Sequence, residues 1–93
     1  MPSELDYESR VLARTDVPDG WDHETLDVRT LGPPEPLRQT LNLLVDLPPE
    51  TAVVQINDRA PQHLYPKLED RGYTYQTVEF DDAVGTAIWP VEE

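Results

Sequence analysis

Residues 26–37 constrain the fold of this chain more than any other stretch, and their sequence is Leu-Asp-Val-Arg-Thr-Leu-Gly-Pro-Pro-Glu-Pro-Leu. Proline fixes the backbone φ angle and has no N–H group, so residues 32–36 predict a stiff turn rather than a strand. The residues before this turn have the apolar alternation of a strand, and Pro36 suits the first turn of a helix. The stretch therefore predicts a strand, a rigid turn and a helix in succession.

The helix that follows this turn is predicted over residues 36–46. Leu37, Leu41, Leu44 and Val45 recur at the spacing of one helical face. Leu43 lies off this stripe and either widens the buried face or belongs to a contact surface. A helix over these residues must end near residue 47, because a residue that precedes proline disfavours the α conformation.

Three more strands and a second helix are predicted after residue 50. Residues 51–56 are rich in β-branched side chains and predict a central, buried strand. A helix is predicted from about residues 61–63 to Gly72, a residue that suits a helix terminus. Strands over residues 73–80 and 86–91 follow each other closely and predict a hairpin, in which Pro90 places the last strand at an edge or at its end.

With a first strand at residues 25–28, the predicted order is βαβαββ. This order predicts the α+β class: an α/β two-layer sandwich with a four-stranded mixed sheet and two helices packed on one face. Strands linked by helices are expected to be parallel neighbours. We expect residues 1–20 to form an acidic, flexible or loosely docked N-terminal extension, anchored by Trp21, and residues 21–93 to form the domain.

The charge of the chain is −12, because 19 acidic residues face seven basic ones. Acidic residues are spread along the whole chain, which favours adaptation to a high-salt cytoplasm, similar to proteins of halophilic archaea, over an ordinary acidic domain with an acidic tail. Binding to a phosphate backbone requires Lys and Arg, so we expect no nucleic-acid partner. The lack of a long apolar run and of a secretory signal predicts a cytoplasmic protein without a membrane partner. The absence of cysteine excludes disulfides and thiol chemistry.

Leu26, Asp27, Leu31 and residues 34–36 give the chain the outline Leu-Asp-x-x-x-Leu-x-x-Pro-Glu-Pro. This outline resembles the TusA-like (SirA-like) family of small sulfur carriers, which carries a Leu-x-Cys-Pro-Glu-Pro segment at the same place. The reactive cysteine of that family falls on Pro33 of this sequence. The resemblance therefore implies the fold but not the persulfide transfer, which needs a thiolate.

The chain resembles more closely a cysteine-less branch of that fold, the domain-of-unknown-function family 2249. The resemblance depends on the motif at residues 26–36 and on a second motif, Asn-Asp-Arg-x-Pro-x-x-Leu-Tyr-Pro-x-Leu, at residues 57–68. Gly72-Tyr73 and Trp89 extend it, so that it covers about residues 24–91. It implies a TusA-like fold and similarity to regulatory or accessory modules, and it implies no activity.

The loops at residues 29–35 and 57–63 should lie side by side, because both follow parallel strands and ligands bind at that edge of open α/β sheets. Eight candidate binding residues belong to these loops or follow them: Arg29, Pro33, Glu35, Asn57, Asp58, Arg59, His63 and Tyr65. The arginines either hold an anion or a partner carboxylate, or pair with Asp27, Glu35 or Asp58 and fix the loops. His23 and His63 lack the spacing of metal ligands, so no metal, cofactor or catalytic residue is predicted.

These observations predict a non-catalytic binding, regulatory or accessory module, a monomer or weak dimer, whose partner is an unknown protein or a small anionic ligand. The alternative is a cysteine-independent enzyme or a sulfur-relay or redox accessory protein that uses Arg29, Glu35, Asp58 and His63. A role with RNA is disfavoured by the net charge.

Overall fold

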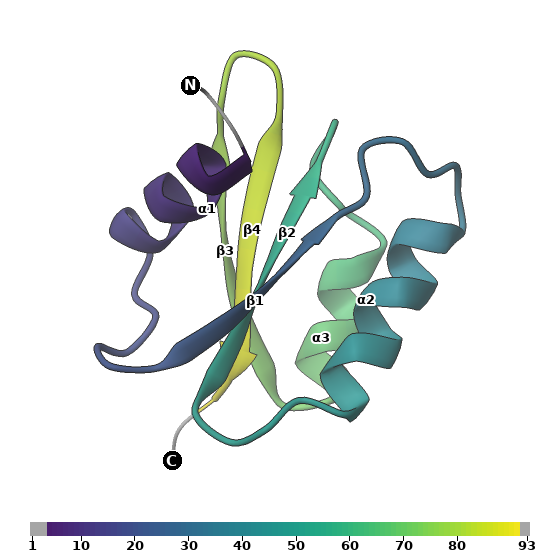
Figure 1. Ribbon diagram of the computed structural model, residues 1–93. Helices are drawn as coiled ribbons and strands as arrows, with labels where there is room; N and C mark the ends of the chain where they lie inside the picture. Colours follow the sequence, from purple (N-terminus) through teal and green to yellow (C-terminus); the bar gives the residue numbers. More distant parts are fainter. Residues whose placement is uncertain (1–3, 92–93) are drawn as a thin grey trace.

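The computed structural model describes residues 4–91, so the ends of the predicted extension and of the predicted domain, residues 1–3 and 92–93, lie outside it. One sheet holds the strands β1 (Asp22–Asp27), β2 (Thr51–Asn57), β4 (Val84–Pro90) and β3 (Tyr73–Glu79), in this order. Helices α2 (Glu35–Val45) and α3 (Leu64–Asp70) cover one face, and α1 (Glu4–Ala13) lies against the other (Figure 1). The predicted α+β architecture is confirmed. None of the helices in the described range is long and apolar enough to cross a membrane.

Strand β2 is the central strand that its β-branched residues predict, and all seven of its residues are buried. It pairs in parallel with β1, from Asp22 opposite Thr51 to Asp27 opposite Ile56. Strand β1 begins three residues earlier than its apolar alternation predicts. It is an edge strand, so the polar residues 22–24 form backbone hydrogen bonds with β2 while their side chains remain exposed.

The prediction that β2 and β3 are parallel neighbours is wrong, whereas the predicted hairpin of β3 and β4 is correct. Strand β4 pairs antiparallel with both β2 and β3 and therefore lies between them. The last strand is consequently internal rather than an edge strand. Pro90 is accommodated because it is the final residue of β4, opposite Tyr73, where a missing N–H removes little of the ladder.

The core under α2 and α3 contains Leu44, Val53, Leu64, Leu68 and Ile88. Leu43 packs against this cluster and thus widens the buried face.

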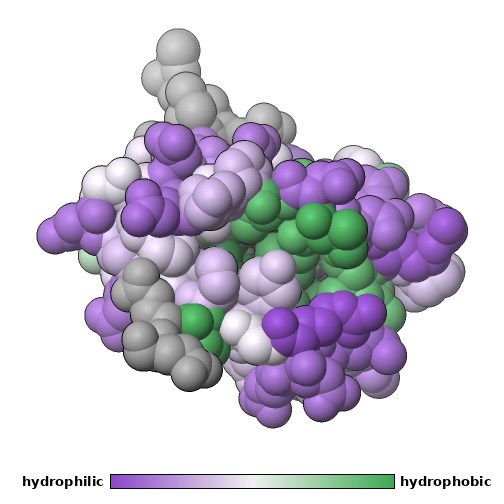
Figure 2. Space-filling model, turned by 90° about the horizontal axis from the view of Figure 1, so that it is seen from below, coloured by the Kyte–Doolittle hydropathy of each residue, from purple (hydrophilic) through white to green (hydrophobic). Residues whose placement is uncertain are grey.

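Val45, which was expected on the same buried face, has 78% of its surface exposed. It ends the helix and is eight residues beyond Leu37, which corresponds to about 80° around the helix axis. Seen from below, Figure 2 shows a hydrophobic area between the sheet and the helices.

The core on the opposite face is closed by α1, within the segment for which sequence predicts a flexible extension. Val11 is completely buried there among Ala52, Val54, Ala87 and Trp89, and Trp21 packs against this cluster. The predicted separation of residues 1–20 from the domain remains a prediction, but α1 contributes to the core. Its sequence gives a weak helical signal because its apolar residues do not recur at a sustained helical spacing.

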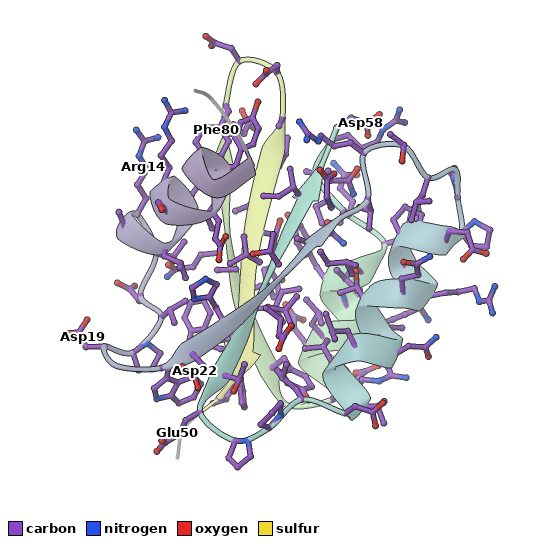
Figure 3. The ribbon with its side chains drawn as sticks, viewed as in Figure 1. Arg14, Asp19, Asp22, Glu50, Asp58 and Phe80 are labelled. Atoms are coloured by element: carbon purple, nitrogen blue, oxygen red, sulfur yellow. The ribbon has the colours of Figure 1, made fainter. Side chains whose placement is uncertain are left out.

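Polar contacts also hold α1 to the sheet. Glu8 forms an ion pair with His23 at the start of β1. The hydroxyl of Tyr7 donates a hydrogen bond of 2.5 Å to Asp82, and this carboxylate raises the pKa of the tyrosine. The guanidinium of Arg14, the residue after α1, lies 5.9 Å from the centre of the Phe80 ring. Both residues are labelled in Figure 3. The helix is therefore fixed at several points along its length.

Gly85 of β4 lies directly below Val11, and a Cβ atom at this position would collide with Cγ2 of Val11. We predict that Gly85→Ala destabilises the protein by about 1–3 kcal/mol, because overpacking forces the helix from the sheet. Urea unfolding followed by tryptophan fluorescence measures this change. Gly32→Ala is the matched control, since a Cβ there meets no atom within 4 Å, and its effect should stay within about 0.5 kcal/mol. Equal effects of the two substitutions would contradict the close packing of α1.

Candidate functional site

A cleft of about 840 Å³ opens at the edge of the sheet where the parallel strands β1 and β2 end. The segment after β1 and the start of α2 form one wall, and the segment after β2 forms the other. Figure 1 shows the course of these segments in the fold. Its lining consists of Leu31, Pro33, Pro34, Pro36, Leu37, Gln55, Asn57, Asp58, Arg59, Ala60, Pro61, Gln62, His63 and Leu64. The structure thus brings together the two loops that parallel pairing places at one edge.

The first wall is a rigid turn. The amide of Leu31 donates to the carbonyl of Val28 at 3.1 Å, and the amide of Glu35 donates to that of Gly32 at 3.0 Å. The peptide bond between Pro33 and Pro34 is cis. The prolines of this wall line the cleft with apolar rings and offer it no backbone N–H donor.

The floor of the cleft is a chain of side-chain hydrogen bonds that begins inside α2. The hydroxyl of Thr40 donates to the carbonyl of Pro36 at 2.7 Å and accepts from Nε2 of Gln55 at 2.8 Å. Oε1 of Gln55 accepts from Nδ2 of Asn57 at 3.2 Å, and Oδ1 of Asn57 accepts from the amide of Asp58 at 2.7 Å. The chain therefore joins the first turn of α2 to the loop that follows β2.

This chain lies in the interior: Thr40 and Gln55 are completely buried and Asn57 is 6% exposed. Across the described residues, no buried side-chain nitrogen or oxygen lacks a hydrogen-bond partner. A fully satisfied buried network fixes its members in one arrangement, because every alternative leaves a polar group without a partner. The two walls are thus held at a defined separation.

Five of the eight candidate residues line the cleft: Pro33, Asn57, Asp58, Arg59 and His63. Asp58, which is labelled in Figure 3, lies at the tip of the second wall, and its carboxylate accepts a hydrogen bond of 3.2 Å from Arg59. Both side chains are more than half exposed. The cleft therefore carries a paired acid and base at its rim rather than an isolated cation.

Arg29 and Glu35 lie outside the lining. Arg29 donates to both carboxylate oxygens of Asp27, at 3.0 and 2.7 Å, and its guanidinium lies 5.2 Å from the centre of the Tyr7 ring. Glu35 accepts a hydrogen bond of 2.9 Å from Arg38 on the same helix. These contacts agree with arginines that fix the loops. Asp58 and His63 line the cleft, whereas Arg29 and Glu35 are not among its lining residues.

Tyr65 also lies outside the cleft, on the side of β3. Its ring stacks on that of Tyr75 with the centroids 4.3 Å apart, and its hydroxyl is 2.5 Å from that of Thr77. Tyr75 donates to Glu69 at 2.6 Å, and this carboxylate raises the pKa of Tyr75 to about 12. Tyr65 therefore joins α3 to the sheet.

The most informative residue that sequence reasoning missed is Gln55. It is the one amide within the apolar strand over residues 51–56, and a polar residue in a buried strand requires a specific partner. That requirement is a signal of a buried network, but the partner, Thr40, becomes apparent only in three dimensions. Asp58 and His63 share the cleft, yet within residues 4–91 no three or more His, Asp or Glu side chains form a group that could hold a metal ion.

The family model described as uncharacterized conserved protein (DUF2249) matches residues 25–89. The chain belongs to the DUF2249 family. The matched residues extend from β1 to β4 and include both walls of the cleft, and they leave out α1. No curated protein and no solved structure matched the chain.

Substitution of Gln55, the buried amide of β2, tests the floor of the cleft in this DUF2249 domain. We predict that Gln55→Leu destabilises the protein by about 1–3 kcal/mol, because it removes the donor to the buried hydroxyl of Thr40 and the acceptor of Nδ2 of Asn57. Urea unfolding measures the cost, and the chemical shift of the Asp58 amide reports the far end of the chain.

Gln39→Leu is the matched control, since Gln39 is exposed on α2. Its effect should stay within about 0.5 kcal/mol, and the Asp58 amide should keep its shift. If Gln55→Leu is neutral and the shift of Asp58 does not change, the floor does not depend on this network.

Proposed function

We propose that this protein is a non-catalytic binding module with a TusA-like fold, and that its cleft holds a small ligand or a segment of a partner protein. The observation that carries the proposal is the cleft between two loops with a fixed polar floor. Its volume lies in the range of about 300–1,000 Å³ that is common for ligand sites. Its position, beyond the carboxyl ends of parallel strands, is where open α/β sheets bind ligands.

The absence of cysteine supports binding over sulfur transfer. The position of the carrier cysteine in the resemblance to TusA-like proteins is taken by Pro33, which lines the cleft. Proline can contact a ligand but cannot attack it, so the proposal retains the site of a sulfur carrier and replaces its chemistry by recognition.

The charge supports the proposal of a cytoplasmic protein adapted to high salt. A net charge of −12 on 93 residues repels itself at low ionic strength, and dissolved salt screens this repulsion. Asp19, Asp22 and Glu50 illustrate the crowding, because they lie at the same end of the molecule in Figure 3.

Filling the cleft tests the proposed function. We predict that Ala60→Trp, at a half-buried position in the second wall, abolishes retention of the ligand, because the indole occupies the space. Tagged protein is recovered from lysate of the native cells at matched salt, and the small molecules and proteins that accompany it are identified by mass spectrometry.

Val45→Trp is the control, since it adds the same indole at an exposed position outside the lining. Molecules retained by the wild type and by Val45→Trp but lost from Ala60→Trp would support the cleft. Identical sets from all three proteins would contradict it.

Thermal unfolding in KCl tests the adaptation to salt. We predict that the melting temperature rises between dilute buffer and molar KCl, because screening removes repulsion in the folded state. The variant Asp19→Asn/Asp22→Asn/Glu50→Gln reduces the net charge to −9 and should show a smaller rise. A melting temperature that is independent of KCl in both proteins would exclude this adaptation.

A further inference from the structure

Asn57 is the member of the floor network that lines the cleft without being completely buried. Asn57 is 6% exposed, whereas Gln55 behind it is completely buried. Its Nδ2 donates one hydrogen bond to Gln55, and its Oδ1 accepts one from the amide of Asp58. A primary amide has two N–H donors and two acceptor lone pairs, so one donor and one acceptor of Asn57 remain for another molecule.

This remaining capacity selects among ligand groups. A carboxamide or lactam offers one donor and one acceptor side by side and pairs with both atoms of Asn57. A carboxylate offers acceptors alone, so when one of its oxygens accepts from the amide of Asn57, the other would face Oδ1 with no hydrogen atom to bond them. An ammonium or amidinium offers donors alone and would face the N–H group.

The charge of the cleft agrees with an uncharged ligand. Within the described part of the chain, Asp58 and Arg59 are the two residues of the lining with a formal charge at pH 7, and they pair with each other at 3.2 Å. Arg29, the other cation of these loops, is bound to Asp27 outside the lining. The lining therefore has no net charge with which to hold an anion against a protein of charge −12.

The walls require an apolar body. Eight of the 14 lining residues are apolar, and four of these are prolines. A ligand gains most of its affinity here by covering this surface, while the polar floor fixes its orientation.

We infer that the cleft binds an uncharged small molecule that carries a carboxamide or lactam group on an apolar body, with that group paired to the side chain of Asn57. The inference depends on the proposed function and names its ligand class. It replaces the anionic ligand expected from the arginines of the two loops.

Three probes of the same shape test this ligand class. Benzamide, benzoate and benzamidine share a ring and differ in carrying no charge, a negative charge or a positive charge. Each is titrated into the ¹⁵N-labelled full-length protein at pH 7.5 in 2 M KCl, where the Debye length is below about 3 Å and long-range attraction or repulsion is screened. The expected result is that benzamide shifts the side-chain amide of Asn57 and the amide of Asp58, with a Kd at least about tenfold lower than that of either charged probe.

Variants at the floor and the rim assign the contact. Asn57→Ala should weaken benzamide about three- to tenfold, as expected for the loss of a hydrogen bond, and should leave the binding of toluene within about twofold. Gln62→Ala removes an exposed amide of the same lining and should leave benzamide within about twofold. If Asn57→Ala does not fold, Asn57→Asp keeps the size of the side chain and should shift the preference from benzamide to benzamidine.

Other results overturn the inference and separate it from the proposed function. Tighter binding of benzoate or benzamidine to the wild-type cleft would exclude the uncharged ligand class and keep the binding module. Shifts with none of the three probes would also exclude this ligand class, and the comparison of Ala60→Trp with Val45→Trp would still decide the proposed function. An Asn57→Ala variant that binds benzamide like the wild type would show that the floor does not recognise the amide.

Discussion

The hydrogen bond between Gln55 and Thr40 is the interaction on which the arrangement of the cleft depends. It crosses from the central strand to α2 in the interior of the protein, where neither side chain reaches water. An amide in such a place must be paired, and only one position of α2 relative to β2 pairs it. The proline turn leads into α2, and the loop after β2 is hydrogen-bonded to Asn57. Because Asn57 is bonded to Gln55, this buried contact determines the positions of both walls.

The cleft and the surface follow different electrostatic rules. The surface is strongly acidic, and its charges face solvent where salt screens them. The lining of the cleft pairs its acid with its base, and the amide of Gln55 is bonded within the protein to Thr40 and Asn57. Recognition by a neutral recessed site depends little on ionic strength, which is consistent with the proposed adaptation to high salt.

Sequence predicts the order of the elements from residue 22 onward and the meeting of the two loops, because local patterns and parallel pairing determine both. It places Val45 in the core and β2 beside β3, and both errors concern tertiary position; for the last strand, Pro90 left open an edge position or the end of the strand, and the strand ends there. The exposure of Val45 depends on how α2 crosses the sheet, and the place of β4 depends on long-range pairing. Gln55 is visible as a polar residue in an apolar strand, but its partner, 15 residues away, is not. Sequence indicates a flexible or loosely docked extension rather than the full helix α1, because residues 1–20 show no sustained apolar periodicity.

The packing of Val11 on Gly85 matters for the choice of domain boundaries in this family. The family match starts at residue 25, so a fragment cut to those limits would lack α1 and Trp21. The face formed by Val54, Ala87 and Trp89 would then lie bare, and an uncovered apolar face of a sheet promotes self-association. Binding measured with such a fragment would reflect its self-association rather than the cleft on the other face of the sheet. Helix α1 contributes no residue to the lining of the cleft. By covering the apolar face of the sheet, it prevents the domain from associating with other copies of itself.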